Sequence, residues 1–307
     1  MNILIFGKNS QLGLTLVSEF PKSKISKHID KIISLSKKDC DLSNSSEIQQ
    51  KIRKCRPNII INCAAFTAVD LAESQPDLVN SVNAYPLKEI AKAAKKNNSL
   101  VIHYSTDYVF DGSKNTSYLE TDNPNPINVY GQSKLLGEKY LKSTWPKHII
   151  FRCSWIFSKH QQNFLKTIIA KAQELKTMNI VADQFGAPTS ANLISKITIK
   201  IIEDYWEYLN NPNKKFNFGL YHLSAKGKTS WYEYAKFIVK NINHKIFPLK
   251  LAAIKINPIN SIDYPTPAKR PLNSKLDTSL IQKTFNISLP NWQDDVLKVL
   301  TEITEEL

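Results

Sequence analysis

The first half of the chain alternates short apolar runs with longer amphipathic stretches. Apolar runs of strand length cover Asn2–Phe6, Lys31–Leu35, Asn58–Cys63, Leu100–Ser105 and His148–Arg152. Helical spacing of apolar positions covers Gln11–Glu19, Ser45–Lys54, Asp77–Lys96 and Val129–Leu141. Such alternation is typical of βαβ units, whose parallel strands are buried on both faces. The pattern therefore predicts a doubly wound, mostly parallel α/β sheet.

After Trp155 the alternation loosens. Helices are predicted at Asn163–Leu175, Ala191–Tyr208, Trp231–Asn241 and Asn291–Glu306, and short strands at Asn179–Ala182 and Gly219–Leu223. Four prolines in Asn257–Pro271 exclude a regular helix there and predict an ordered loop. We expect a sheet domain over residues 1–157, to which elements around 191–225 return. Residues 158–190 and 226–307 would form a smaller mixed α/β domain.

Composition excludes several classes of protein. The 307 residues are 42% hydrophobic and 22% charged, as in a globular protein and not a disordered or coiled-coil one. No apolar run approaches the ~18 residues of a membrane helix, and the first strand begins without a secretory signal pattern. Four scattered cysteines and six histidines form no zinc or disulfide pattern. We expect a cytoplasmic protein with no membrane contact and no metal site.

The net charge of +14 raises nucleic-acid binding as a function. The lysines, however, stand in small separate groups and not in one stripe interleaved with aromatic residues. We therefore expect a lysine-rich solvated surface and no nucleic-acid partner. An anionic small substrate would suit the charge equally well.

A glycine-containing loop follows the first strand and opens the first helix, where a dinucleotide diphosphate is commonly held. Gly7 would allow the tight turn and Gly13 the close packing of helix on strand. Ser10 replaces the middle glycine of the usual pattern. By itself this loop fits either a dinucleotide site or an ordinary turn between a strand and a helix.

Tyr130 and Lys134 are one helical turn apart and project from one face. A tyrosine exchanges protons poorly near neutral pH unless a cation such as Lys134 favours its phenolate. Thr106, at the end of the fourth strand, can hydrogen-bond the same substrate oxygen. A surface Tyr–Lys pair and a simple Thr–Asp turn are the structural alternatives. Glycine loop, Thr106 and the Tyr–Lys pair, in that chain order, favour hydride reduction of a carbonyl with a nicotinamide coenzyme.

With these motifs the sequence resembles the extended short-chain dehydrogenases/reductases of Rossmann fold, and among them the dTDP-4-dehydrorhamnose reductase family. The resemblance runs nearly from end to end, and its C-terminal blocks are specific to this family. The matching blocks are Phe6–Lys8 with Gln11 and Gly13, Asn62–Asp70 with Ala72–Ser74, Ser105–Phe110, Asn128–Gly131, Arg152–Trp155, Asp183–Thr189, Gly219–Leu223 and Tyr264–Ser274.

The resemblance implies an NAD(P)H-dependent oxidoreductase of dTDP-rhamnose biosynthesis. It would reduce the C4 ketone of dTDP-6-deoxy-L-lyxo-4-hexulose to dTDP-L-rhamnose, so the partner is a dTDP-sugar, and a homodimer is left open. Residues 1–157 would be the dinucleotide-binding domain and the smaller domain would bind the sugar nucleotide. An epimerase or dehydratase acting on nucleotide sugars, and a non-catalytic NADP-binding regulatory subunit, remain alternatives.

The resemblance also implies a role for each matched residue. Tyr130 would be the catalytic acid, Lys134 its pKa-lowering partner and Thr106 an assisting hydroxyl. The coenzyme would be bound by Gly7, Ser10, Gln11, Leu12, Gly13, Asp41, Leu42, Ala65, Phe66, Thr67, Tyr104, Tyr130 and Lys134. The substrate would be bound by Thr106, Asp107, Trp155, Arg270 and Asn273.

Three features depart from the family pattern or refine it. Ser10 stands where glycine is usual, and Phe66 where histidine is frequent. Some relatives bridge subunits with a divalent metal, but the matching positions here, Thr15, Asn192 and Gln293, are weak ligands for a hard cation.

The end of the second strand bears on the choice of coenzyme. It carries no Asp or Glu for a ribose 2′-hydroxyl, whereas Ser36 and Lys37, followed by Lys38, can meet a 2′-phosphate. We therefore expect NADPH to be used at least as well as NADH. The alternative is that both lysines point to solvent.

Overall fold

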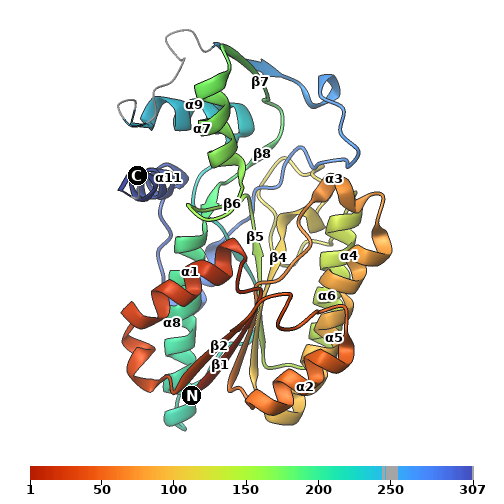
Figure 1. Ribbon diagram of the computed structural model, residues 1–307, viewed down its shortest axis with the longest axis vertical. Helices are drawn as coiled ribbons and strands as arrows, with labels where there is room; N and C mark the ends of the chain where they lie inside the picture. Colours follow the sequence, from red (N-terminus) through yellow and green to blue (C-terminus); the bar gives the residue numbers. More distant parts are fainter. Residues whose placement is uncertain (244–245, 247–254, 306–307) are drawn as a thin grey trace.

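The computed structural model describes residues 1–243, 246 and 255–305, and within them a six-stranded parallel sheet forms the centre of the molecule (Figure 1). Its strands are β1 (Asn2–Phe6), β2 (Lys31–Leu35), β3 (Ile59–Asn62), β4 (Leu100–Thr106), β5 (His148–Cys153) and β10 (Gly219–Leu223). They lie in the order β10-β5-β4-β3-β1-β2. This arrangement confirms the predicted doubly wound, mostly parallel Rossmann-type sheet.

Helices cover both faces of the sheet, as continuous apolar strands require. Alternate strand residues divide between two apolar layers: Ile3 and Ile5 belong to one, Leu4 and Phe6 to the other. The first layer lies under α1 (Gln11–Glu19) and α8 (Ala191–Asn210), which pack against each other. The second lies under α2 (Ser45–Cys55), α5 (Tyr85–Asn97) and α6 (Val129–Thr144) (Figure 1).

The single helix predicted over Asp77–Lys96 is wrong, because the chain breaks at Ala84 into α4 (Pro76–Asn83) and α5. Pro86 stands at the start of α5, where its missing N–H costs nothing, whereas in one continuous helix it would remove a hydrogen bond and clash with the carbonyl four residues earlier. The break has a consequence for the site. Asn83 is the last residue before the break, and its buried amide donates to the Ser133 hydroxyl over 3.0 Å and to the Phe66 carbonyl over 3.1 Å.

The C-terminal part is a smaller layer of helices with short strands. Its predicted helices are present as α7 (Phe164–Glu174), α9 (Trp231–Asn241) and α11 (Trp292–Glu305), with an additional α10 (Ser279–Phe285). Strand β7 (Thr177–Val181) pairs in parallel with β12 (Lys255–Ile259). The loop predicted over Asn257–Pro271 is therefore wrong at its start. A two-stranded sheet has free edges, so Pro258 need not donate a hydrogen bond there.

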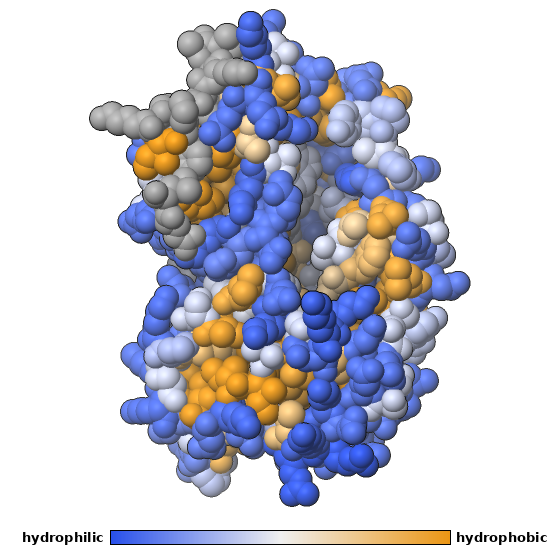
Figure 2. Space-filling model, viewed as in Figure 1, coloured by the Kyte–Doolittle hydropathy of each residue, from blue (hydrophilic) through white to orange (hydrophobic). Residues whose placement is uncertain are grey.

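Short elements complete the described fold. They are η1 (Phe20–Lys22), η2 (Lys24–His28), η3 (Asp107–Val109), η5 (Ser261–Asp263), α3 (Val69–Ala72), β6 (Ile156–Phe157), β8 (Phe185–Gly186), β9 (Thr189–Ser190) and β11 (Thr229–Ser230). Among the described helices, none has both the length and the apolar character needed to cross a bilayer. Most of the face in Figure 2 is hydrophilic, and the surface is hollowed near its centre.

Candidate active site

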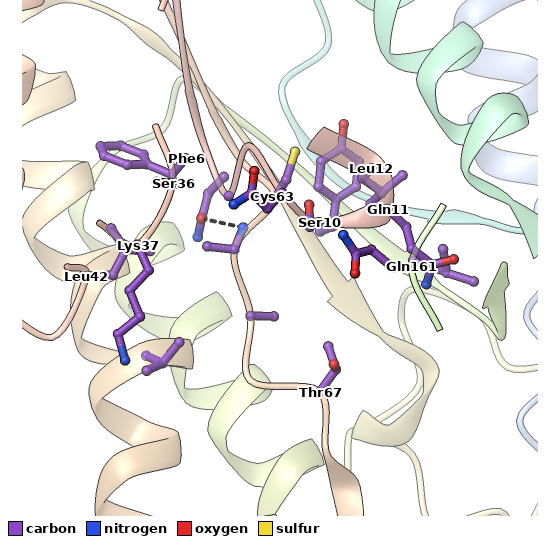
Figure 3. A pocket seen from close by; sticks show the side chains of 18 of the residues that line it. Phe6, Ser10, Gln11, Leu12, Ser36, Lys37, Leu42, Cys63, Thr67 and Gln161 are labelled. Atoms are coloured by element: carbon purple, nitrogen blue, oxygen red, sulfur yellow. Dashed lines mark hydrogen bonds between the residues drawn. The ribbon is translucent and has the colours of Figure 1, made fainter. Parts of the chain in front are cut away.

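A cavity of about 600 Å³ opens at the carboxyl ends of β1, β3 and β4. The strand order reverses between β1 and β3, and open α/β sheets bind ligands at such a switch point. Of the residues predicted to bind coenzyme or to catalyse, the cavity brings together Gly7, Ser10, Gln11, Leu12, Ser36, Lys37, Asp41, Leu42, Ala65, Thr67, Tyr104, Tyr130 and Lys134. Figure 3 shows Lys37 and Leu42 on one side, Gln11 and Leu12 on the other, and Ser10 between them.

The glycine loop is shaped by close backbone contacts. Gly7 has a left-handed φ of 85°, and a Cβ there would lie 2.5 Å from the Ala64 nitrogen. A Cβ on Gly13 would lie 2.2 Å from the Gly7 carbonyl oxygen. Gly13 is thus a packing residue and does not line the cavity.

Ser10 caps the helix that follows this loop. Its hydroxyl accepts a hydrogen bond from the Gly13 N–H over 3.0 Å. The serine that replaces glycine therefore serves as the N-cap of α1. The N–H groups of Gln11 and Leu12, in the first turn, have no acceptor within the helix and suit an anion.

Lys134 is buried, with 2% of its surface exposed. Its amino group donates to the Tyr104 carbonyl over 2.6 Å and lies 3.4 Å from Nε2 of His103. Burial lowers the pKa of Lys134 to about 8, although the Glu138 carboxylate acts in the opposite direction. These contacts contradict the alternative of a lysine stem on the surface.

Tyr130 faces the cavity from the same helix. Asn128 caps α6 by accepting from the Gly131 N–H over 2.8 Å, which fixes the start of the helix. Burial raises the pKa of Tyr130 above its ordinary value, and the Thr106 hydroxyl acts in the opposite direction through a hydrogen bond. Tyr130 is therefore a phenol at neutral pH, which is the form that can give a proton to a ketone.

Thr106 and Asp107 form a buried polar group at the end of β4. The Thr106 hydroxyl donates to Oδ1 of Asp107 over 3.1 Å, and the Ser154 hydroxyl donates to Oδ2 over 3.0 Å. Burial raises the pKa of Asp107 to about 6. Neither residue lines the cavity itself, but the Thr106 hydroxyl hydrogen-bonds Tyr130, which does.

Trp155 is not among the residues that line the cavity. Its ring stacks on Trp231 with centroids 3.5 Å apart and an interplanar angle of 8°. The backbone of Trp155 is left-handed, with φ of 46°, and a Cβ on Gly186 would lie 2.6 Å from its ring. Trp231, far along the chain, carried no signal in the sequence that would pair it with Trp155.

Arg270 and Asn273 are both engaged with protein groups. The Arg270 guanidinium binds both carboxylate oxygens of Asp70, over 2.9 and 2.7 Å, and the Thr266 hydroxyl over 2.7 Å. The Asn273 amide donates to the carbonyls of Lys114 and Thr116 over 2.6 and 2.8 Å. A role of either side chain in holding a diphosphate stays a prediction.

The stretch Ile32–Lys38 itself carries no carboxylate, and the nearest acidic residue, Asp39, follows it outside the cavity lining. A tight turn brings Asp39 back, and its Oδ2 accepts from the backbone N–H and the hydroxyl of Ser36 over 2.8 and 2.6 Å. Asp39 lies outside the strand, so strand position alone could not reveal it. Phe66 does not line the cavity, and its backbone N–H donates to the Asn83 side chain over 2.8 Å.

Other lining residues were not predicted from the sequence. They are Phe6, Asn9, Cys40, Asn62, Cys63, Ala64, Val82, Ser105, Ile156, Gln161 and Gln162. Most flank predicted residues on the same loop. Gln161 and Gln162 come from beyond β5, and no periodicity or motif singles them out.

Comparison with known proteins agrees with this geometry. The family model described as "RmlD substrate binding domain" matches residues 1–305. The dTDP-4-dehydrorhamnose reductase of Salmonella typhimurium is 42% identical over 307 residues, covering 99% of this chain and 98% of the relative. The enzyme of that name from Escherichia coli K12 is 42% identical over 303 residues, with the same coverage.

Solved structures give the same result. A dTDP-4-dehydrorhamnose reductase from Clostridium acetobutylicum superimposes with a TM-score of 0.87 at 32% identity, covering 99% of this chain and all of that one. One from Bacillus anthracis, solved in complex with NADP, gives 0.86 at 32% identity, covering 98% of this chain and 99% of that one. The chain belongs to the dTDP-4-dehydrorhamnose reductase family.

Proposed function

We propose that the chain reduces the C4 ketone of dTDP-6-deoxy-L-lyxo-4-hexulose to dTDP-L-rhamnose with NADPH or NADH. The observation that carries the proposal is that Tyr130 and Lys134 line one cavity together with the glycine loop, and that Thr106 hydrogen-bonds Tyr130 there. Full-length relatives with the name of this reductase support the choice of substrate.

The cavity would hold the dinucleotide. Backbone N–H groups of Gln11 and Leu12 at the start of α1 suit the diphosphate, and Asp41 with Leu42 would border the adenine. Ala65, Thr67 and Tyr104 would border the ribose and nicotinamide. When bound, the coenzyme supplies the hydride, and this chain supplies the orientation and the proton.

Tyr130 would give the proton to the developing alkoxide at C4. Its phenol form is favoured by burial, which suits the direction of reduction. Thr106 would donate to the same oxygen and so stabilise the charge that forms there. Lys134, held by the Tyr104 carbonyl, would then favour the phenolate that remains.

The substrate would lie between the sheet domain of residues 1–157 and the smaller domain of 158–190 and 226–307. Asp107 and Trp155 would contact the sugar. Arg270 would bind the diphosphate through its planar guanidinium. It would either keep its ion pair with Asp70 or give it up when the diphosphate binds. Asn273 would help to hold the diphosphate by positioning the segment of Lys114 and Thr116, to whose carbonyls its amide donates.

The deciding experiment is NADPH oxidation, followed by absorbance, with the 4-keto-hexulose as substrate. We expect stoichiometric consumption of coenzyme and formation of dTDP-L-rhamnose. Conversion of a nucleotide sugar without net consumption would instead indicate an epimerase or dehydratase. Coenzyme binding without turnover would indicate a regulatory subunit.

We place the enzyme in the cytoplasm, where its four cysteines would remain the free thiols that the structure contains. Cell fractionation tests this location. A homodimer stays a prediction of the family resemblance, and sedimentation velocity of the purified chain measures it.

A further inference from the structure

One wall of the cavity is formed by a segment that lies later in the sequence than the predicted coenzyme-binding motifs. Gln161 and Gln162 lie between β6 and α7, outside the sheet strands, yet they line the same cavity as Ser10 and Leu12. Figure 3 shows Gln161 close to Gln11 and Leu12, at the start of the first helix. The predicted coenzyme contacts all precede β5 along the chain, so this wall is new.

The wall is fastened to the glycine loop by hydrogen bonds. Oε1 of Gln11 accepts from the Ser158 hydroxyl over 2.9 Å and from the Asn163 amide over 3.0 Å. The Asn163 amide also donates to the Ser158 carbonyl over 2.7 Å, and its Oδ1 caps α7 by accepting from the Lys166 N–H. Both ends of segment 158–163 are therefore held at a fixed distance from the loop.

Within this segment, Gln161 has an unusual backbone. Its φ of 55° is left-handed, a conformation that favours glycine and costs free energy for glutamine. Residues kept in such conformations cluster at ligand sites. The hydrogen bonds of Asn163 hold the conformation in place.

The two glutamines differ in what their amides do. Nε2 of Gln162 donates to the Thr167 hydroxyl over 2.9 Å. In the described parts of the chain, no protein group forms a hydrogen bond with the amide of Gln161. The Gln162 amide is thus already bonded to α7. The exposed Gln161 amide has no protein partner in the described chain and is available to a ligand in the cavity.

We propose that Gln161 binds the coenzyme, its side-chain amide donating to the diphosphate that the start of α1 holds. The diphosphate is the part of a dinucleotide that would lie nearest, since Gln161 flanks Gln11 and Leu12 while Lys37 and Leu42 mark the other end of the cavity (Figure 3). A neutral amide donor complements an anion that two backbone N–H groups already face. This inference rests on the proposed coenzyme site.

The test measures coenzyme affinity without the sugar. Gln161→Ala removes the amide, and we expect the Kd for NADPH and for NADH to rise about tenfold, as for loss of a hydrogen bond to a charged group. The two coenzymes share the diphosphate, so the Kd of both should rise by the same factor. Affinity for 2′-AMP, which has the adenosine phosphate end but no diphosphate, should not change.

Two further variants separate binding from folding. Gln162→Ala is the matched control from the same loop, and its coenzyme Kd should stay within about twofold of wild type. Gln161→Gly removes the amide but suits the left-handed backbone. It should therefore raise the Kd for NADPH as Gln161→Ala does, while keeping or raising the Tm.

Unchanged NADPH affinity in both Gln161 variants would overturn the proposal. Equal weakening of 2′-AMP binding would overturn the assignment to the diphosphate, and a higher Kd for the nucleotide sugar alone would move the contact to the substrate. These readouts need no turnover. A wild-type chain that binds NADPH but never oxidises it would contradict the proposed function and leave this comparison intact.

Discussion

The ammonium of Lys134 donates to the backbone carbonyl of Tyr104 over 2.6 Å. A helix residue is thereby joined to strand β4, two residues before Thr106. The bond fixes the buried cation beneath the cavity, on the face of α6 that also carries Tyr130. The catalytic residues of the proposal are therefore positioned by the sheet as well as by their own helix.

Lys134→Met should lower kcat by about the 10²-fold or more typical of acid–base groups, and should weaken coenzyme binding. The ammonium favours the Tyr130 phenolate that follows proton transfer, and methionine keeps the volume without the charge. Steady-state rates and a direct coenzyme titration measure the two effects. If kcat and coenzyme Kd both remained at wild-type values, Lys134 would have no part in the chemistry.

The pH profile should report the same lysine. Burial lowers the pKa of Lys134 to about 8, so the ammonium is lost as the pH rises through that value. We expect kcat/KM of wild type to fall on the alkaline side of about pH 8, and this decline to be absent in Lys134→Met. A flat wild-type profile to pH 10, with kcat/KM unchanged across it, would contradict the assignment.

The same titration affects stability, with a definite sign. The folded pKa of Lys134 lies below its unfolded value, so between about pH 8 and 10.5 the unfolded chain binds more protons. This lysine therefore destabilises the fold most below pH 8 and less as the pH rises. The stability gained by Lys134→Met relative to wild type should accordingly shrink across that range.

Arg270 should bind and not catalyse. If its guanidinium grips the diphosphate, Arg270→Ala raises KM for the nucleotide sugar much more than it lowers kcat, because the contact is equal in ground and transition states. Asp70→Asn keeps the arginine but loosens its bidentate pair, and should raise KM less. A variant whose kcat falls while KM holds would place Arg270 near the reacting carbonyl instead.

Coenzyme preference should depend on opposing charges at the end of β2. Lys37 lines the cavity and would attract a 2′-phosphate, whereas Asp39, held beside Ser36, would repel it. Lys37→Glu should shift kcat/KM several-fold towards NADH, and Asp39→Ala towards NADPH. Asp39 does not line the cavity itself but bonds Ser36, which does. Lys38→Glu is the control, because Lys38 does not line the cavity and, in the described chain, forms no side-chain hydrogen bond with a residue that does. An unchanged ratio in both Lys37→Glu and Asp39→Ala would refute the electrostatic explanation.

Local sequence pattern predicted the sheet well because its strands are continuous apolar runs. The run Ile59–Ile61 requires burial on both faces, and only a sheet covered by helices supplies it. The break at Ala84 was missed because helical periodicity continues across it, while the decisive residue, Pro86, can begin a helix but cannot stand inside one. Periodicity thus locates elements better than it locates their ends.

The site was predictable where one motif carries its own geometry. Tyr130 and Lys134 share a helix face by spacing alone, and Gly7 with Gly13 mark a turn. The partners of these residues come from elsewhere in the chain and need the fold. Examples are the Tyr104 carbonyl at Lys134, Trp231 on Trp155, and Gln161 across the cavity.

The most direct test of the proposed reaction is the turnover of Tyr130→Phe with NADPH and the 4-keto-hexulose. The change removes the transferable proton and little volume, so coenzyme affinity should remain near that of wild type. We expect kcat to fall by about 10²- to 10⁴-fold. A Phe variant that keeps more than about a tenth of the wild-type kcat would contradict the assignment of Tyr130 as the catalytic acid.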